Sequence, residues 1–115
     1  MNRLKILTLA LLCFAGSAMA IEGEVVSRAY EVGLDQFQAP ATANSRVFFT
    51  PCPDDCDRQS VRVTPETRYS VNGKAMKLTD FRKALLLVQD RRNAMVTVLH
   101  HLESDTVVSI DASLD

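Results

Sequence analysis

The sequence lacks the short motifs that identify common catalytic and nucleotide-binding sites. It contains no nucleophile elbow of the G-x-S-x-G type, no glycine-rich phosphate loop and no H-E-x-x-H zinc motif. Serine, histidine and aspartate do occur, but a chain of 115 residues contains all three by chance. The sequence therefore predicts a protein that is not an enzyme and that needs no cofactor.

An excess of positive charge is also lacking. The chain has 13 Lys+Arg against 14 Asp+Glu. Nucleic-acid binding needs a concentrated positive face, and most of the aromatic residues fall on positions expected to face a core. We therefore expect no nucleic-acid partner. The pair Arg91-Arg92 is interpreted as a solvated segment close to a helix C-terminus, where cations are favoured.

Only one long hydrophobic run is present, and it lies near the start of the sequence. Residues 6–15 form this run, with Arg3 and Lys5 before it and the small residues Ala18 and Ala20 after it. A basic start, an apolar run and an A-x-A site are the three parts of a secretory signal peptide. We predict a signal peptide over residues 1–20, cleaved after Ala20, and hence a location in the periplasm or outside the cell.

Two other roles for this run agree less well with its residues. A transmembrane anchor needs about 20 apolar residues, and the run is about half that length. A lipoprotein signal would place the lipid on Cys13, but the preceding Leu12 is too bulky for that cleavage site. No later segment is long enough to cross a membrane, so the mature chain is expected to have no transmembrane segment. It would be a single small β-rich domain of residues 21–115 with a net charge of −3.

Cysteine is scarce once Cys13 has left with the signal peptide. The remaining pair, Cys52 and Cys56, is expected to form a structural disulfide in an oxidising compartment. Three intervening residues and the absence of a following helix argue against a thioredoxin-type redox role. A calcium site at Asp54, Asp55 and Asp57 lacks the spacing and the glycine of a calcium loop, and solvated turn residues explain these carboxylates better.

A soft-metal site is the main alternative for the cysteines. Cys52, Cys56 and one of the histidines His100 and His101 would suit Cu(I) or Zn²⁺. The two histidines are sequence neighbours, and neighbours on a strand point to opposite faces of a sheet. They cannot chelate one ion together while the strand continues, and the simpler interpretation is one solvated histidine and one at the edge of the core.

Short segments of alternating polarity, separated by turns, fill most of the mature chain. Asn72-Gly73 is the strongest hairpin signal, because both residues tolerate the positive φ of a type I′ turn. Residues 24–32 fit a strand or a helix, and their valines favour the strand. We expect about six short strands from seven candidate segments, residues 24–32, 46–50, 59–64, 67–71, 74–78, 94–101 and 106–114. In the last of these, the inward side chains should be Val108, Ile110, Ala112 and Leu114.

One helix is expected between the two hairpins. Phe81, Ala84, Leu85 and Val88 follow the i, i+3, i+4, i+7 spacing of a core-facing helix, and either Thr79 or Asp80 is placed to cap its start. Strands at this spacing with one helix predict a mainly β fold, a small barrel or sandwich whose open end the helix covers.

A weakly specific pattern runs through residues 59–112. It consists of a strand that ends in Asn72-Gly73-Lys74, then Leu78-Thr-Asp-Phe81, then a closing hairpin. It resembles small exported bacterial domains of unknown function. The resemblance implies a small barrel similar in shape to oligonucleotide/oligosaccharide-binding folds, and it implies no activity.

These observations predict a small periplasmic or secreted binding or accessory module that is not catalytic. Its expected partner is an envelope protein or a glycan. The alternative is a soft-metal (Cu/Zn) carrier that uses Cys52, Cys56 and a histidine, and a metal titration of the reduced protein separates the two hypotheses.

Overall fold

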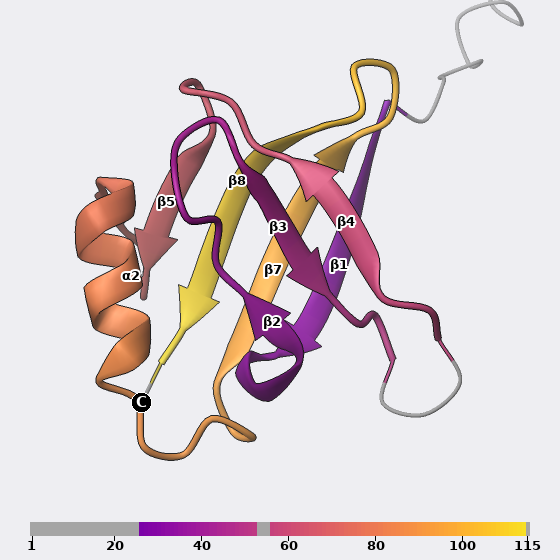
Figure 1. The fold of residues 1–115 in the computed structure, drawn as a ribbon. Helices are drawn as coiled ribbons and strands as arrows, with labels where there is room; N and C mark the ends of the chain where they lie inside the picture. The colour runs from indigo at the N-terminus through magenta and orange to yellow at the C-terminus, as the bar shows by residue number, and fades with distance from the viewer. Residues whose placement is uncertain (1–25, 53–55, 115) are drawn as a thin grey trace, which may run out of the picture.

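The computed structural model describes residues 26–52 and 56–114. The predicted signal peptide, with Ala18 and Ala20 at its cleavage site, lies outside the described residues. The described residues form a mainly β domain with one α-helix, as expected (Figure 1). The strands are β1 (Ser27–Gly33), β2 (Phe37–Gln38), β3 (Arg46–Phe49), β4 (Gln59–Arg62), β5 (Arg68–Val71), β6 (Lys74–Met76), β7 (Met95–His101) and β8 (Thr106–Ser113).

All described strands belong to one curled sheet. Its main path has the order β1-β7-β8-β4-β3-β2, and β5 pairs with β8 and carries β6, so β1, β2 and β6 are edges and the sheet does not close into a barrel. β8 is the strand to which most of the others connect. It pairs antiparallel with β7 along one side. Along its other side, β4 pairs in parallel at its start and β5 pairs in parallel farther on. On this second side of β8 the sheet therefore splits into two branches, one made of β4, β3 and β2 and the other of β5 and β6.

The curl brings the first strand over the branch that carries β3. The ring of Tyr30 on β1 lies 5.1 Å from the ring of Phe49 on β3, although the two strands are not paired. Between the layers lie the fully buried side chains of Val47, Val96 and Ile110. The segment 24–32, which the sequence left open, is thus a strand at its described residues, because its pairing with β7 decides the conformation.

Helix α2 (Leu78–Leu86) covers the end of the sheet beside β5 (Figure 1). Phe81 and Leu85 are buried as the spacing predicted, and the Phe81 ring lies 5.2 Å from that of Tyr69 on β5. The predicted cap was wrong: the helix begins at Leu78, and Lys77 precedes it with no side-chain hydrogen bond. No helix in residues 26–52 and 56–114 is long and apolar enough to cross a membrane.

Both predicted hairpins are present. Asn72 and Gly73 have φ values of 51° and 83°, and the turn joins β5 to β6. The β7–β8 hairpin contains a bulge, because Leu99 faces Ser109 while His100 faces Val107. Val108 is the extra residue, so it is 37% exposed and Val107 is buried instead. The predicted inward position of Val108 was therefore wrong, since a bulge shifts the alternation by one residue.

Candidate functional site

The two cysteines lie in the connection between β3 and β4. Their Cα atoms are 5.5 Å apart, within the range of a disulfide. Residues 53–55 between them lie outside the described residues, and so do Asp54 and Asp55 of the weighed calcium site. Both cysteines lie between the end of β3 and the start of β4, a placement suited to a structural cross-link.

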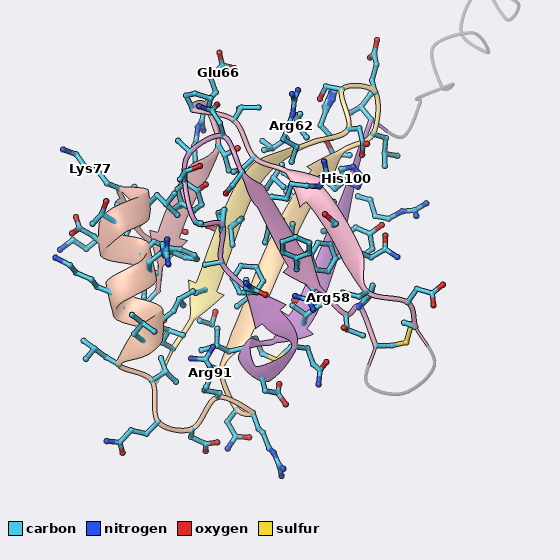
Figure 2. The ribbon with its side chains drawn as sticks, in the orientation of Figure 1. Arg58, Arg62, Glu66, Lys77, Arg91 and His100 are labelled. Carbon is cyan, nitrogen blue, oxygen red and sulfur yellow. A yellow bond between two sulfur atoms is a disulfide. The ribbon has the colours of Figure 1, made fainter. Side chains whose placement is uncertain are left out.

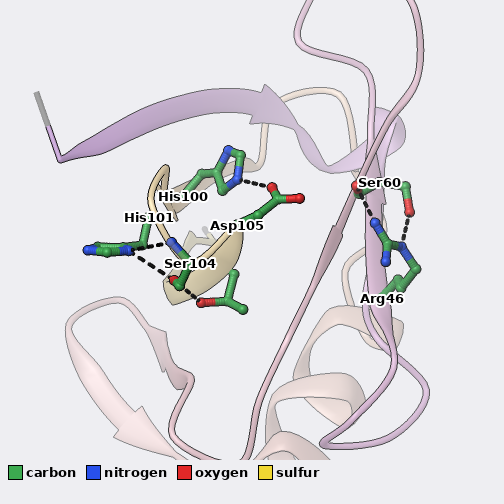
Figure 3. Close-up of polar contacts among 7 residues, drawn as sticks. Arg46, Ser60, His100, His101, Ser104 and Asp105 are labelled. Carbon is green, nitrogen blue, oxygen red and sulfur yellow. Dashed lines mark hydrogen bonds and ion pairs between the residues drawn. The ribbon is translucent and has the colours of Figure 1, made fainter.

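The two histidines end β7 and point to different partners, as expected for neighbours on a strand (Figure 3). His100 packs against the Tyr30 ring, and its Nε2 lies 2.7 Å from Asp105 Oδ1. His101 Nδ1 accepts a hydrogen bond from the Ser104 backbone N–H at 3.2 Å and lies 2.9 Å from Ser104 Oγ. One imidazole is thus mostly covered and the other borders the hairpin loop.

Serine, histidine and aspartate come together at this hairpin without forming a catalytic chain. A Ser–His–Asp triad needs one imidazole between the hydroxyl and the carboxylate. Here Ser104 contacts the ring of His101, whereas Asp105 contacts the ring of His100. The arrangement is that of two local contacts that hold the turn.

The structure does not bring the cysteines and histidines together. Arg62, at the end of β4, pairs with Thr106, and Thr106 faces His101 in the β7–β8 hairpin. The cysteines lie before the start of the same strand, and Figure 2 shows the disulfide well away from His100. Among residues 26–52 and 56–114, no group of three His, Cys, Asp or Glu side chains is placed to hold a metal ion.

A different feature is more prominent: a groove of about 500 Å³ between α2 and the strands β2 and β3, here called the arginine groove. Its walls carry the side chains of Arg46, Arg82 and Arg91, and no aspartate or glutamate lines it. The neighbouring hollow along β2 contains Arg58, together with one acid, Asp35. The volume lies within the range of about 300–1,000 Å³ typical of ligand pockets.

Each guanidinium of the arginine groove is held by a neutral oxygen. Arg46 donates to Ser60 Oγ and to the Ser60 carbonyl at 2.6 and 2.9 Å (Figure 3). Arg82 Nη1 donates to the Ala41 carbonyl at 2.7 Å. Arg91 Nη1 donates to the Leu85 carbonyl at 3.0 Å and so caps the end of α2, as the sequence predicted for a cation.

No carboxylate neutralises these arginines in the part of the chain that the structure describes. The one contact there within 4 Å between a carboxylate and a lysine, arginine or histidine nitrogen joins Asp105 to His100. On the far side of β2, Arg58 donates to Gln38 Oε1 at 2.7 Å and lies 4.9 Å above the Phe48 ring (Figure 2). A domain with more acidic than basic residues thus concentrates uncompensated positive charge along one groove.

The floor of the groove is apolar. Phe37 and Leu85 are buried beneath it and Phe48 is half-buried. At its rim, Leu86 is 79% exposed, and the adjacent Leu87, which faces a separate hollow, is 81% exposed. Leu86 therefore adds exposed apolar surface to the rim of the groove.

Sequence reasoning missed this site. Its arginines come from β3, from α2 and from the loop after α2, positions that a pattern of alternating polarity treats as solvent-facing. The usable signal was Leu86-Leu87, which continues the apolar character of the helix past its core-facing stripe. The groove itself depends on the packing of α2 against the β2 side of the sheet, a long-range contact.

Comparisons with known proteins add no identification. No protein family model matches the chain, no curated protein matches it significantly, and no solved structure does so.

Proposed function

We propose that this protein is an exported, non-catalytic binding module of the cell envelope, and that it holds its partner in the arginine groove. The observation that carries the proposal is the set of three guanidiniums without carboxylate partners, over an apolar floor, among the described residues. An anionic partner could form charge-assisted hydrogen bonds with these guanidiniums, and such bonds are stronger than those between neutral groups.

The remaining features fit the same role. The N-terminal pattern of basic residues, apolar run and Ala18-Met19-Ala20 is that of an exported protein. A short loop closed by Cys52 and Cys56 stabilises a small domain in an oxidising compartment. Ser104 lies beside His101, but Asp105 contacts the other histidine, so these residues do not form a Ser–His–Asp chain.

Affinity capture tests the proposal. The tagged mature protein is incubated with envelope extracts in parallel with Arg82→Gln and Lys83→Gln variants, and bound components are identified by mass spectrometry. Both residues are exposed on α2, but only Arg82 lines the groove. We expect a component retained by the wild type and by Lys83→Gln, lost with Arg82→Gln, and bound directly by the purified domain.

Two results would contradict the proposal. If all three proteins retain the same components, the groove is not the binding site. If the partner leaves the purified domain with a changed covalent mass, the domain is an enzyme.

A further inference from the structure

We infer that the arginine groove takes an acidic segment of a partner protein, in which carboxylates flank a bulky apolar side chain. This inference rests on the proposed function and names the class of ligand. The observation behind it is the combination, in one groove, of three guanidiniums that lack a carboxylate partner among the described residues and the exposed side chain of Leu86.

The guanidiniums are arranged for carboxylates. Arg46, Arg82 and Arg91 each donate a hydrogen bond to an oxygen of Ser60, Ala41 or Leu85, which favours one orientation of each side chain in the absence of a ligand. A guanidinium has five N–H donors in a planar fork, and Arg82 uses one of them among the described contacts. The remaining donors match the two oxygens of a carboxylate, which arginine binds in bidentate fashion.

The apolar part of the groove selects against a ligand that is only charged. A sulfated or phosphorylated glycan would satisfy the arginines but leave Phe48 and Leu86 in contact with water. A peptide can place a leucine or phenylalanine on this surface and carboxylates on the arginines at the same time. Interface anchors of this kind, an apolar side chain in a pocket with charged neighbours at its rim, carry most of the affinity in protein complexes.

Shape and overall charge argue against an anionic membrane. The groove is concave, with a volume of about 500 Å³, whereas a lipid surface is flat. Acidic residues outnumber basic ones in the whole chain, 14 to 13. A negatively charged membrane would repel the rest of such a domain, whereas a single acidic segment meets only the local positive field.

The test uses short probes on the purified, ¹⁵N-labelled mature protein. The main probe is the capped peptide Glu-Glu-Leu-Phe-Glu-Glu. Its matched controls replace every Glu by Gln, or replace Leu-Phe by Ser-Ser. A sulfated oligosaccharide and phosphatidylglycerol vesicles are the competing ligands. Amide shifts are followed at about 20 mM and again at about 150 mM salt, because the longer Debye length at low salt preserves electrostatic attraction.

We expect the acidic apolar peptide to shift amides along β2, β3 and the end of α2. Each control peptide should bind at least about tenfold more weakly, and raising the salt should weaken the main probe. Arg82→Gln should weaken binding about tenfold, while Lys83→Gln should change it by less than about twofold. Leu86→Gln should weaken binding severalfold, and Leu87→Gln should leave it unchanged.

All four substituted side chains are exposed, so the variants should fold, and their melting temperatures verify this. If the glycan or the vesicles bind in an Arg82-dependent manner and the peptide does not, the inference is wrong and the proposed function stands. If no probe binds in a way that depends on Arg82, the inference is wrong, and the capture experiment with Arg82→Gln decides on the proposed function. Equal binding of the Glu and Gln peptides would also overturn the inference.

Discussion

Two side-chain atoms are buried without a hydrogen-bond partner among the described residues: the Tyr69 hydroxyl and His100 Nδ1. Tyr69 is 6% exposed and lies on the core-facing side of β5, as its place in the alternating sequence predicted. Burial raises the pKa of the Tyr69 hydroxyl above its ordinary value of 10.0. The ring of Tyr69 therefore contributes packing, whereas its hydroxyl, which has no hydrogen-bond partner among the described residues, contributes nothing to stability.

Tyr69→Phe should accordingly be as stable as the wild type at neutral pH or more stable, by up to about 1 kcal/mol, because it removes an unpaired buried hydroxyl. The sign of the pH effect follows from the raised pKa. The folded state holds the proton more tightly, so wild-type stability is retained below about pH 10 and is lost as pH rises from there through the folded-state pKa. Urea unfolding at about pH 7 and pH 10.5 should show the two proteins diverging, and parallel pH profiles would contradict the assignment.

The cysteine pair offers a second prediction at this scale. Cys52 and Cys56 should be joined in the exported protein, because their separation permits the bond and an oxidising compartment favours it. Intact mass after alkylation should show two blocked thiols only when reductant is added first. Labelling of both thiols in freshly isolated, unreduced protein would contradict the disulfide.

At the scale of single elements, the β5–β6 turn has the clearest physical basis. Gly73 has a φ of 83°, and a Cβ added there would meet no atom within 4 Å. Glycine is therefore favoured at position 73 because it tolerates a positive φ, and not because space for a side chain is lacking. Asn72 also has a positive φ, and its side-chain oxygen accepts the Leu114 backbone N–H at 2.8 Å, which ties the turn to the residue after β8.

Gly73→Val should destabilise the domain by about 1 kcal/mol or more, since a β-branched residue adopts positive φ poorly. Gly73→Asn is the matched control, because asparagine tolerates this conformation, and it should retain most of the stability. Chemical unfolding of the three proteins measures the difference. Equal midpoints for Val and Asn would show that the turn does not constrain the fold.

The elements that the sequence predicted are those fixed by local chemistry. Alternation placed Val61, Val63 and Tyr69 inward, and Asn72-Gly73 located the tight turn. The failures are long-range. β2 is a two-residue strand that exists only because β3 pairs with it, and the bulge at Val108 appears only when β7 and β8 are aligned. The arginine groove belongs with these failures, since its walls meet only in the folded chain.

At the scale of the whole molecule, the predicted signal peptide determines the compartment. We expect the exported product to begin at Ile21, because Ala18 and Ala20 occupy the two positions where signal peptidase accepts small side chains. N-terminal sequencing of the protein recovered outside the cytoplasm identifies its first residue. A product that starts at Met1, or one with a lipid on Cys13, would contradict the export argument and the compartment assigned to the cysteine pair.

The position of β8 in the chain has a consequence for how the molecule assembles. β8 follows every other described strand, yet β4, β5 and β7 all pair with it. During synthesis, the β3–β4 and β5–β6 strand pairs can form early. The branch that contains β4 and the branch that contains β5 are connected through β8, so nothing links them until residues 106–113 have been made. Parallel pairing across such separations requires closing long loops before any contact forms, which slows folding. The chain should therefore stay open until its last strand arrives and then fold in a single cooperative step.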